Sequence, residues 1–166
     1  MGASADAQLA FDHAALSEGG SIELGDLSIG VLATPGHTPE HISFTVTEAK
    51  RSTPMNLFSG GALIVGGAAR TDLLGHEHTL PLARQLYHTL HDKLLKLPDE
   101  VIVYPTHGAG SFCNAPGSAE RVTTIGQERI NNRLALARSE EEFVAEAMSG
   151  LPDRGDALAG NRRVAK

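Results

Sequence analysis

A strand-like run that ends in a histidine held between proline and glycine occurs twice in this chain. The first run, Leu27 to Ala33, leads into the turn TPGHT with His37. The second, EVIVYP, leads into the turn PTHG with His107. Proline fixes the backbone and glycine permits tight turns, so each histidine is held in one orientation at a strand end. Loops at such positions often carry chemistry, and metal ligands need a fixed orientation. The two histidines are therefore candidate metal ligands.

Further strands are predicted between these turns. Residues 21–33 alternate apolar and polar side chains around Gly25 and Asp26, which predicts a hairpin or two short strands with one buried face. A β-rich run follows at Ile42 to Thr47, and another short strand begins at Asn56.

Helices are predicted in the second half of the chain. Residues 80–97 carry leucines spaced four apart, with Pro81 in the first turn. A second helix is predicted near Thr124 to Leu136, and a third opens at Ser139, where Glu142 completes a capping box. The end of the chain, DRGDALAGNRRVAK, is typical of a linker-like tail.

Composition limits the kinds of partner. The 166 residues suit one soluble domain, and a net charge of −6 with a pI near 5.7 provides no basic surface for nucleic acid or membrane. The single cysteine, Cys113, excludes an internal disulfide and is interpreted as a packed loop residue. Neither a long apolar run nor a signal peptide occurs, so a cytoplasmic location is expected.

The remaining histidines are interpreted as structural or surface residues. His88 and His91 lie off the leucine stripe and are expected to face solvent. His76 and His78 border a loop, and His13 precedes any clear element.

Three short segments of the sequence resemble segments of a known protein family. TPGHTPEHISF, LFSGGALIVGGAARTDLLG and VYPTHG, in this order, resemble the later half of the metallo-β-lactamase fold family. The resemblance is strongest to the glyoxalase II and persulfide dioxygenase branch and its rhodanese fusions, and it runs from about Phe11 to Cys113. It implies an α/β fold in which residues 1–115 form the second half of an αββα sandwich and residues 116–166 form a helical extension with a linker-like tail.

The resemblance also implies a metal site for zinc or iron. The histidine of TPGHT in that family is a metal ligand, which corresponds to His37, and the histidine of YPTHG, which corresponds to His107, serves the second metal position. Gly61 stands where the family has a ligand aspartate. The family's HxHxDH motif is absent from the sequence, so Met1 is expected to begin within the domain.

Neighbouring groups are weighed as substitutes for the missing donors. Arg70 and Asp72 are expected to form a hydrogen-bonded turn or ion pair rather than a ligand. His41 lies four residues after His37, but Pro39 between them argues against a shared helical face.

Two histidines do not complete a catalytic site, because zinc keeps about three protein ligands and non-haem iron uses two histidines and a carboxylate. The sequence therefore predicts a truncated or degenerate metal-dependent hydrolase of thioesterase or persulfide dioxygenase lineage, weakly active or inactive as this chain alone. Its substrate, if it is active, is a small thioester or persulfide. Two alternatives stay open: a non-catalytic remnant that acts in assembly or regulation, and an incomplete gene product.

A half-sandwich leaves one sheet face without its usual cover. If roughly 1,000 Å² of apolar surface loses its partner, the deficit is on the order of 25 kcal/mol as an upper bound. Because domains are stable by only about 5–15 kcal/mol, the chain is expected to be marginal alone, to form a homodimer, or to pair with a separate N-terminal half.

Overall fold

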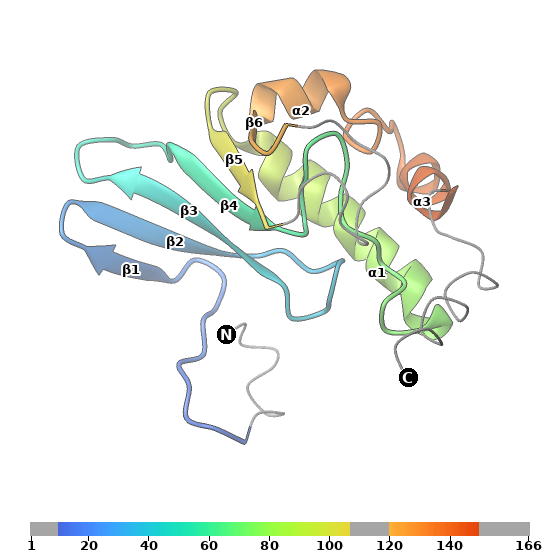
Figure 1. Cartoon of the computed structure of the whole chain (residues 1–166), viewed down its shortest axis with the longest axis horizontal. Helices are drawn as coiled ribbons and strands as arrows, with labels where there is room; N and C mark the ends of the chain where they lie inside the picture. Colours follow the sequence, from blue (N-terminus) through green and yellow to red (C-terminus); the bar gives the residue numbers. More distant parts are fainter. Residues whose placement is uncertain (1–9, 107–119, 150–166) are drawn as a thin grey trace, which may run out of the picture.

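The computed structural model describes residues 10–106 and 120–149, which form an α/β fold, as predicted (Figure 1). The strands in chain order are β1 (Ser21–Leu24), β2 (Leu27–Ala33), β3 (Ile42–Glu48), β4 (Asn56–Gly60), β5 (Ile102–Pro105) and β6 (Thr123–Thr124). The helical elements are α1 (His76–His88), the π-helical turn η2 (Thr89–Lys93), the 3-10 turn η3 (Leu94–Lys96), α2 (Ile125–Asn131) and α3 (Glu140–Ser149).

The strands form one mixed sheet in the order β1-β2-β3-β4-β5-β6. All neighbours are antiparallel except β4 and β5, which are parallel and are joined through α1, η2 and η3. Parallel pairing brings the ends of β4 and β5 to the same edge of the sheet. There the amide of Thr106 donates to the carbonyl oxygen of Gly60 at 3.1 Å. Thr106, which follows β5, therefore lies beside the end of β4.

The predicted hairpin is confirmed at β1 and β2, but the predicted buried face is not found on β1, whose four residues are all exposed because β1 is an edge strand away from the helices. Leu24 pairs with Leu27, and the two residues between them form the turn, in which Gly25 has a φ of 61°. Glycine reaches this left-handed conformation at no steric cost, so the Gly25-Asp26 pair closes the hairpin without strain.

The core lies between one face of the sheet and the helices. Leu57 of β4 and Val103 of β5 point into it, and the leucine stripe of α1, η2 and η3 packs against them. The fully buried members of this cluster include Leu86, Leu90, Leu94, Ile125 and Phe143. In Figure 1 the helices gather beside β4 to β6, and β1 to β3 extend away from them.

The first helix differs from its prediction at both ends. It begins at His76, so Pro81 lies beyond the first turn, and it changes to a π turn at Thr89. His88 is exposed as predicted and pairs with Asp92 and Glu140. The prediction for His91 was wrong. The segment after α2 packs on this side of the helix, so His91 is half-buried, with its Nε2 3.2 Å from the carbonyl oxygen of Leu134.

The capping residues predicted for the third helix, Ser139 and Glu142, both act at its start, although the return bond of the box reaches the amide of Arg138 instead of that of Ser139. The amide of Glu142 donates to Oγ of Ser139 at 3.2 Å, and the Glu142 carboxylate accepts from the amide of Arg138 at 2.8 Å. The helix before it is shorter than predicted and ends at Asn131. Oδ1 of Asn132 accepts from the amide of Leu134 at 3.0 Å, and such local bonds compete with helix continuation.

Among the described residues, none of the helices combines the length and the apolar character that a bilayer crossing requires.

Candidate functional site

His37 lies in the turn between β2 and β3, at the strand end where the sequence places it. The turn is closed at its base by the amide of Thr34, which donates to the carbonyl oxygen of His41 at 2.9 Å. Within it the amide of Gly36 donates to the carbonyl oxygen of Thr38 at 3.2 Å. These short-range bonds give His37 a defined backbone position.

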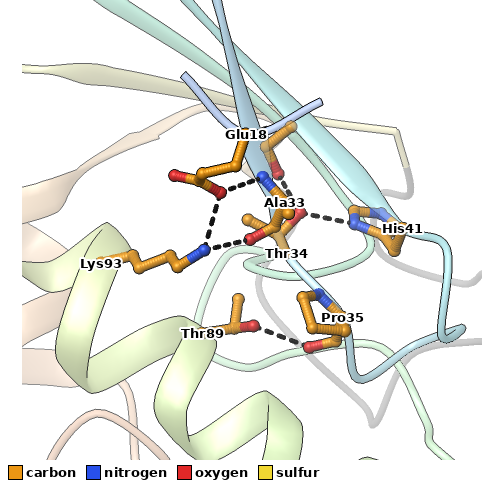
Figure 2. A network of polar contacts seen from close by, with 8 residues as sticks. Glu18, Ala33, Thr34, Pro35, His41, Thr89 and Lys93 are labelled. Atoms are coloured by element: carbon orange, nitrogen blue, oxygen red, sulfur yellow. Dashed lines mark hydrogen bonds and ion pairs between the residues drawn. The ribbon is translucent and has the colours of Figure 1, made fainter. Parts of the chain in front are cut away.

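Two residues of the π turn η2 hold the backbone between Ala33 and Pro35, at the end of β2, by hydrogen bonds (Figure 2). Oγ1 of Thr89 donates to the carbonyl oxygen of Pro35 at 2.7 Å, and Nζ of Lys93 donates to that of Ala33 at 2.7 Å. Lys93 also pairs with Oε2 of Glu18 at 2.7 Å, and this carboxylate accepts from the amide of Ala33 at 2.6 Å. The end of β2 is thus fixed by residues from a distant helical segment. Short π segments occur often next to functional sites.

The tautomer of His37 is set by its contact with the next loop. Its Nδ1 lies 2.8 Å from the carbonyl oxygen of Arg70. A carbonyl oxygen only accepts, so Nδ1 carries the proton and Nε2 carries the lone pair of the neutral ring. Metal-ligating histidines have this arrangement, with the second ring nitrogen donating to a carbonyl or carboxylate. His37 is therefore oriented as a single nitrogen donor.

Arg70 and Asp72 form the ion pair that the sequence predicts. The guanidinium donates through Nε and one terminal nitrogen to both carboxylate oxygens of Asp72. This fork-shaped contact uses both oxygens of the carboxylate and fixes the backbone of Arg70 beside His37. The ion pair thus holds Asp72 in this loop, as the sequence predicts.

His41 connects the turn to the end of β4. Its Nε2 accepts from the amide of Gly61 at 3.1 Å, so Nδ1 carries the proton and donates to Oγ1 of Thr34 at 2.8 Å. The Thr34 hydroxyl then donates to Oγ of Ser43 at 2.8 Å, and that hydroxyl donates to the carbonyl oxygen of Ser59 at 3.2 Å. Each hydrogen bond in this series therefore has a defined donor and a defined acceptor. His41 thus holds the turn in place, a role that the sequence did not reveal.

The space beside Gly61 is already filled. A Cβ atom at this position would lie 2.8 Å from Cδ2 of His37 and 3.0 Å from Cβ of Ala69. Both separations are shorter than ordinary carbon contacts of about 3.5–4.0 Å. An aspartate here would therefore require the His37 ring to move from its contact with Arg70.

Replacing Gly61 with aspartate is expected to lower the free energy of unfolding by about 1–3 kcal/mol, the usual range for overpacking. Gly67→Asp is the matched control, because a Cβ at Gly67 would have its nearest neighbour, Cγ1 of Ile64, at 3.9 Å. Urea denaturation measures both variants. Equal stability of the two would contradict the crowding inferred for Gly61.

The described residues do not supply a complete coordination set. No group of three or more His, Cys, Asp or Glu side chains in residues 10–106 and 120–149 is arranged to hold a metal ion. His37 provides one donor of suitable orientation, and Gly61 provides no side chain. His107 and Cys113 lie outside the described residues.

A buried carboxylate supports the loop from the other side. Glu128 of α2 is 2% exposed, and its carboxylate accepts from the amide of Gly66 at 3.1 Å and from Nδ2 of Asn132 at 2.7 Å. Burial raises the pKa of Glu128, although hydrogen bonds from Asn132, Thr123 and Gly66 oppose the shift. The sequence analysis missed this group. Its one local signal is the four-residue spacing to Asn132, which suits a side-chain pair on a helix.

Known proteins resemble this chain over part of their length. No family model matches the sequence. The human mitochondrial persulfide dioxygenase ETHE1 is 34% identical over 130 residues, which cover 78% of this chain and 43% of the human protein. Hydroxyacylglutathione hydrolase GloC of Haemophilus influenzae is 32% identical over 122 residues, covering 74% of this chain and 47% of the relative. The chain thus spans less than half the length of these two relatives.

A solved structure agrees with the described fold. The crystal structure of a metallo-β-lactamase from Staphylococcus aureus superimposes with a TM-score of 0.75 and 34% identity, covering 84% of this chain and 40% of the S. aureus chain. The similarity in sequence and in backbone therefore extends over most of this chain and a minor part of the larger protein.

Proposed function

The chain belongs to the metallo-β-lactamase superfamily, with glyoxalase II and persulfide dioxygenase relatives, and from this premise we propose that it is part of a metal-dependent hydrolase or dioxygenase. In this proposal residues 1–115 are the second half of the catalytic domain, and residues 116–166 are a helical extension with a linker-like tail. The substrate class is a small thioester or persulfide, following the names of the relatives.

The proposed role of this chain is to contribute ligands rather than a whole site. His37 is the best-supported donor, because the carbonyl oxygen of Arg70 fixes its tautomer. His107 is proposed as a ligand of a second metal position, which is consistent with the path of Thr106 beside Gly60. A catalytic ion needs about three protein ligands, so further donors have to come from another polypeptide segment.

One observation carries the conclusion that the chain alone is weakly active or inactive. Gly61 brings no carboxylate, and the ring of His37 crowds the space that a side chain there would need. The described residues therefore do not fit a catalytic zinc or iron ion by themselves, because the missing donors are not found among their side chains.

The purified chain is expected to retain well below one zinc or iron ion per molecule after metal loading and dialysis, as measured by elemental analysis. Two imidazoles cannot hold a catalytic ion tightly without a further donor. Persulfide oxidation and thioester hydrolysis are expected to be the same for the chain and for His37→Ala.

His88→Ala is the control for metal loading, because His88 is an exposed histidine on α1. Stoichiometric metal that is lost in His37→Ala and kept in His88→Ala would contradict the incomplete site. Turnover by the chain that disappears in His37→Ala would contradict the proposed inactivity.

A second candidate function is non-catalytic, in assembly or regulation. The observation that favours it is the series of hydrogen bonds from Gly61 through His41, Thr34 and Ser43 to Ser59, which gives His41 a structural role beside Gly61. Both candidates predict that the chain alone lacks turnover and bound metal, so the discriminating measurement is turnover after the chain is mixed with a polypeptide that supplies the HxHxDH motif: turnover that is lost in His37→Ala would count against the non-catalytic candidate.

A further inference from the structure

One loop connects the candidate site with the helical extension. Residues 61–70, which we call the glycine loop, follow β4 directly and extend towards α2 before α1 begins (Figure 1). The base of the loop lies beside His37, because Nδ1 of this ring is 2.8 Å from the carbonyl oxygen of Arg70. The tip of the loop lies against α2. The same loop therefore contacts His37 at one end and the extension at the other.

Two buried side chains hold the tip of the glycine loop, which consists of Gly66 and Gly67. The carboxylate of Glu128 accepts from the amide of Gly66 at 3.1 Å, and Nδ2 of Asn132 donates to the carbonyl oxygen of Gly67 at 3.0 Å. Nδ2 of Asn132 also donates to Oε2 of Glu128 at 2.7 Å, so the two side chains, which we call the α2 clamp, support each other. Both side chains are buried. The loss of one bond of the clamp would therefore leave a buried polar group unpaired.

Backbone hydrogen bonds run along the glycine loop from its tip to its base. Ile64 and Gly67 exchange both of their amide-to-carbonyl bonds at 3.0 Å, and the amide of Ala69 donates to the carbonyl oxygen of Gly61 at 2.8 Å. The two legs of the loop are therefore held together, as in a short hairpin. Leu63 and Ile64 are fully buried, and Ala69 is nearly so. Because close-packed interiors transmit displacement rather than absorb it, a shift of the tip reaches the base.

The base of the loop sets the orientation of His37. The carbonyl oxygen of Arg70 holds the proton of the ring on Nδ1. On its other side the ring packs so closely on Gly61 that a Cβ atom there would lie 2.8 Å from Cδ2 of His37. The ring is thus in contact with the first and the last residue of the loop. Since hydrogen bonds weaken steeply away from their preferred geometry, a small displacement of Arg70 is enough to release the ring.

We propose that Glu128 and Asn132 are positioning residues for His37, which they hold through the glycine loop. The ion pair between Arg70 and Asp72 does not replace them, because it joins two residues of the same segment and moves with the loop. The α2 clamp instead ties the loop to a separate helix. The extension is thus part of the candidate site. The value of this arrangement for chemistry rests on the proposed function, whereas the orientation of His37 does not.

The test uses the full 166-residue chain without metal or substrate and reads the ring nitrogen shifts of its histidines by NMR at alkaline pH, where the rings are neutral. The signals of His37 are identified by their loss in His37→Ala. In the natural chain they are expected to show a protonated Nδ1 and an unprotonated Nε2. In Glu128→Ala they are expected to shift towards the average of the two tautomers, because the Arg70 carbonyl no longer stays at bonding distance. Asn132→Ser, which keeps an oxygen for the amide of Leu134, is expected to change them in the same direction.

Ile125→Ala is the matched control for a general loss of stability. Ile125 is a fully buried core residue on the same helix, and its apolar side chain forms no hydrogen bond with the loop. This variant is expected to unfold at lower urea concentration and to leave the His37 signals unchanged. Glu128→Gln keeps an oxygen acceptor in the clamp and is expected to restore the signals of the natural chain. Circular dichroism checks that each variant folds.

A proton on Nε2 of His37 in the natural chain would overturn the proposal, as would unchanged His37 signals in whichever of Glu128→Ala and Asn132→Ser folds. An equal change in Ile125→Ala would also overturn it, because general loosening would then explain the effect. The proposed function fails by a separate result: no metal and no turnover after the chain is mixed with a polypeptide that supplies the HxHxDH motif. That result leaves the ring signals, and the conclusion drawn from them, unaffected.

Discussion

Gly36→Ala is expected to lower the free energy of unfolding by about 3 kcal/mol and to move His37 away from Arg70. Gly36 has a φ of 143°, a conformation that residues with a side chain rarely adopt. A Cβ atom there would lie 2.5 Å from Cβ of Leu86 and 2.7 Å from its Cα. Because the obstruction is the backbone of α1, the turn has to shift, and strain adds to overpacking.

Gly25→Ala is the control that separates strain from collision. Gly25 has a φ of 61°, but a Cβ atom there would have no heavy atom within 4 Å. Its expected cost is therefore the backbone strain alone, about 1–2 kcal/mol. Urea denaturation gives both values, and the histidine ring signals in NMR spectra report the position of His37. Equal losses for the two variants, with unchanged ring signals in Gly36→Ala, would contradict the prediction.

Glu128→Ala is expected to lower the free energy of unfolding by about 3 kcal/mol. The carboxylate is the acceptor for the amide of Gly66 and for one N–H of Asn132, and its removal leaves donors in a buried position with a cavity beside them. The loop between Gly61 and Arg70 is then expected to loosen, because α2 holds it at Gly66. Thermal and urea unfolding measure the loss.

Glu128→Gln is the companion variant, because glutamine keeps an acceptor for Asn132 and does not titrate. Burial raises the pKa of Glu128 in the folded chain, so the folded state favours the protonated carboxyl. The resulting stabilisation is complete below the ordinary glutamate pKa and is lost as the pH rises through the raised folded value.

The stability of the natural chain relative to Glu128→Gln is therefore expected to fall as the pH rises from about 4 towards neutrality. Other carboxylates contribute equally to both proteins and cancel in this difference. Urea denaturation at a series of pH values measures this difference in the free energy of unfolding. A difference that stays constant, or that grows with pH, would show that the carboxylate is stabilised in its charged form.

Features whose partners are close in the sequence were predictable. The Gly25-Asp26 turn, the helix cap at Ser139 and the ion pair between Arg70 and Asp72 each join residues at most four positions apart. The strand-end position of His37 follows from the same local logic, since a proline and a glycine flank it after an apolar run.

Features that depend on distant partners were not predictable. The carboxylate of Glu128 meets Gly66 across 62 positions, and Thr89 meets Pro35 across 54. His91 was expected to face solvent, because its helical spacing says nothing about a segment that packs on it from 43 positions away. The leucine pattern likewise did not predict that α1 begins at His76, because the buried leucines of this helix begin only at Leu82.

The sequence by itself determined the α/β elements and the hairpin, because these depend on residue type and local spacing, and its family resemblance implied that Gly61 stands in place of a ligand aspartate. Only the tertiary structure decided that His41 is a hydrogen-bonded support and that the His37 ring crowds Gly61. The physical reason is that side-chain direction and burial depend on which strands and helices become neighbours, and this chain brings β4 beside β5 only after a long helical crossover.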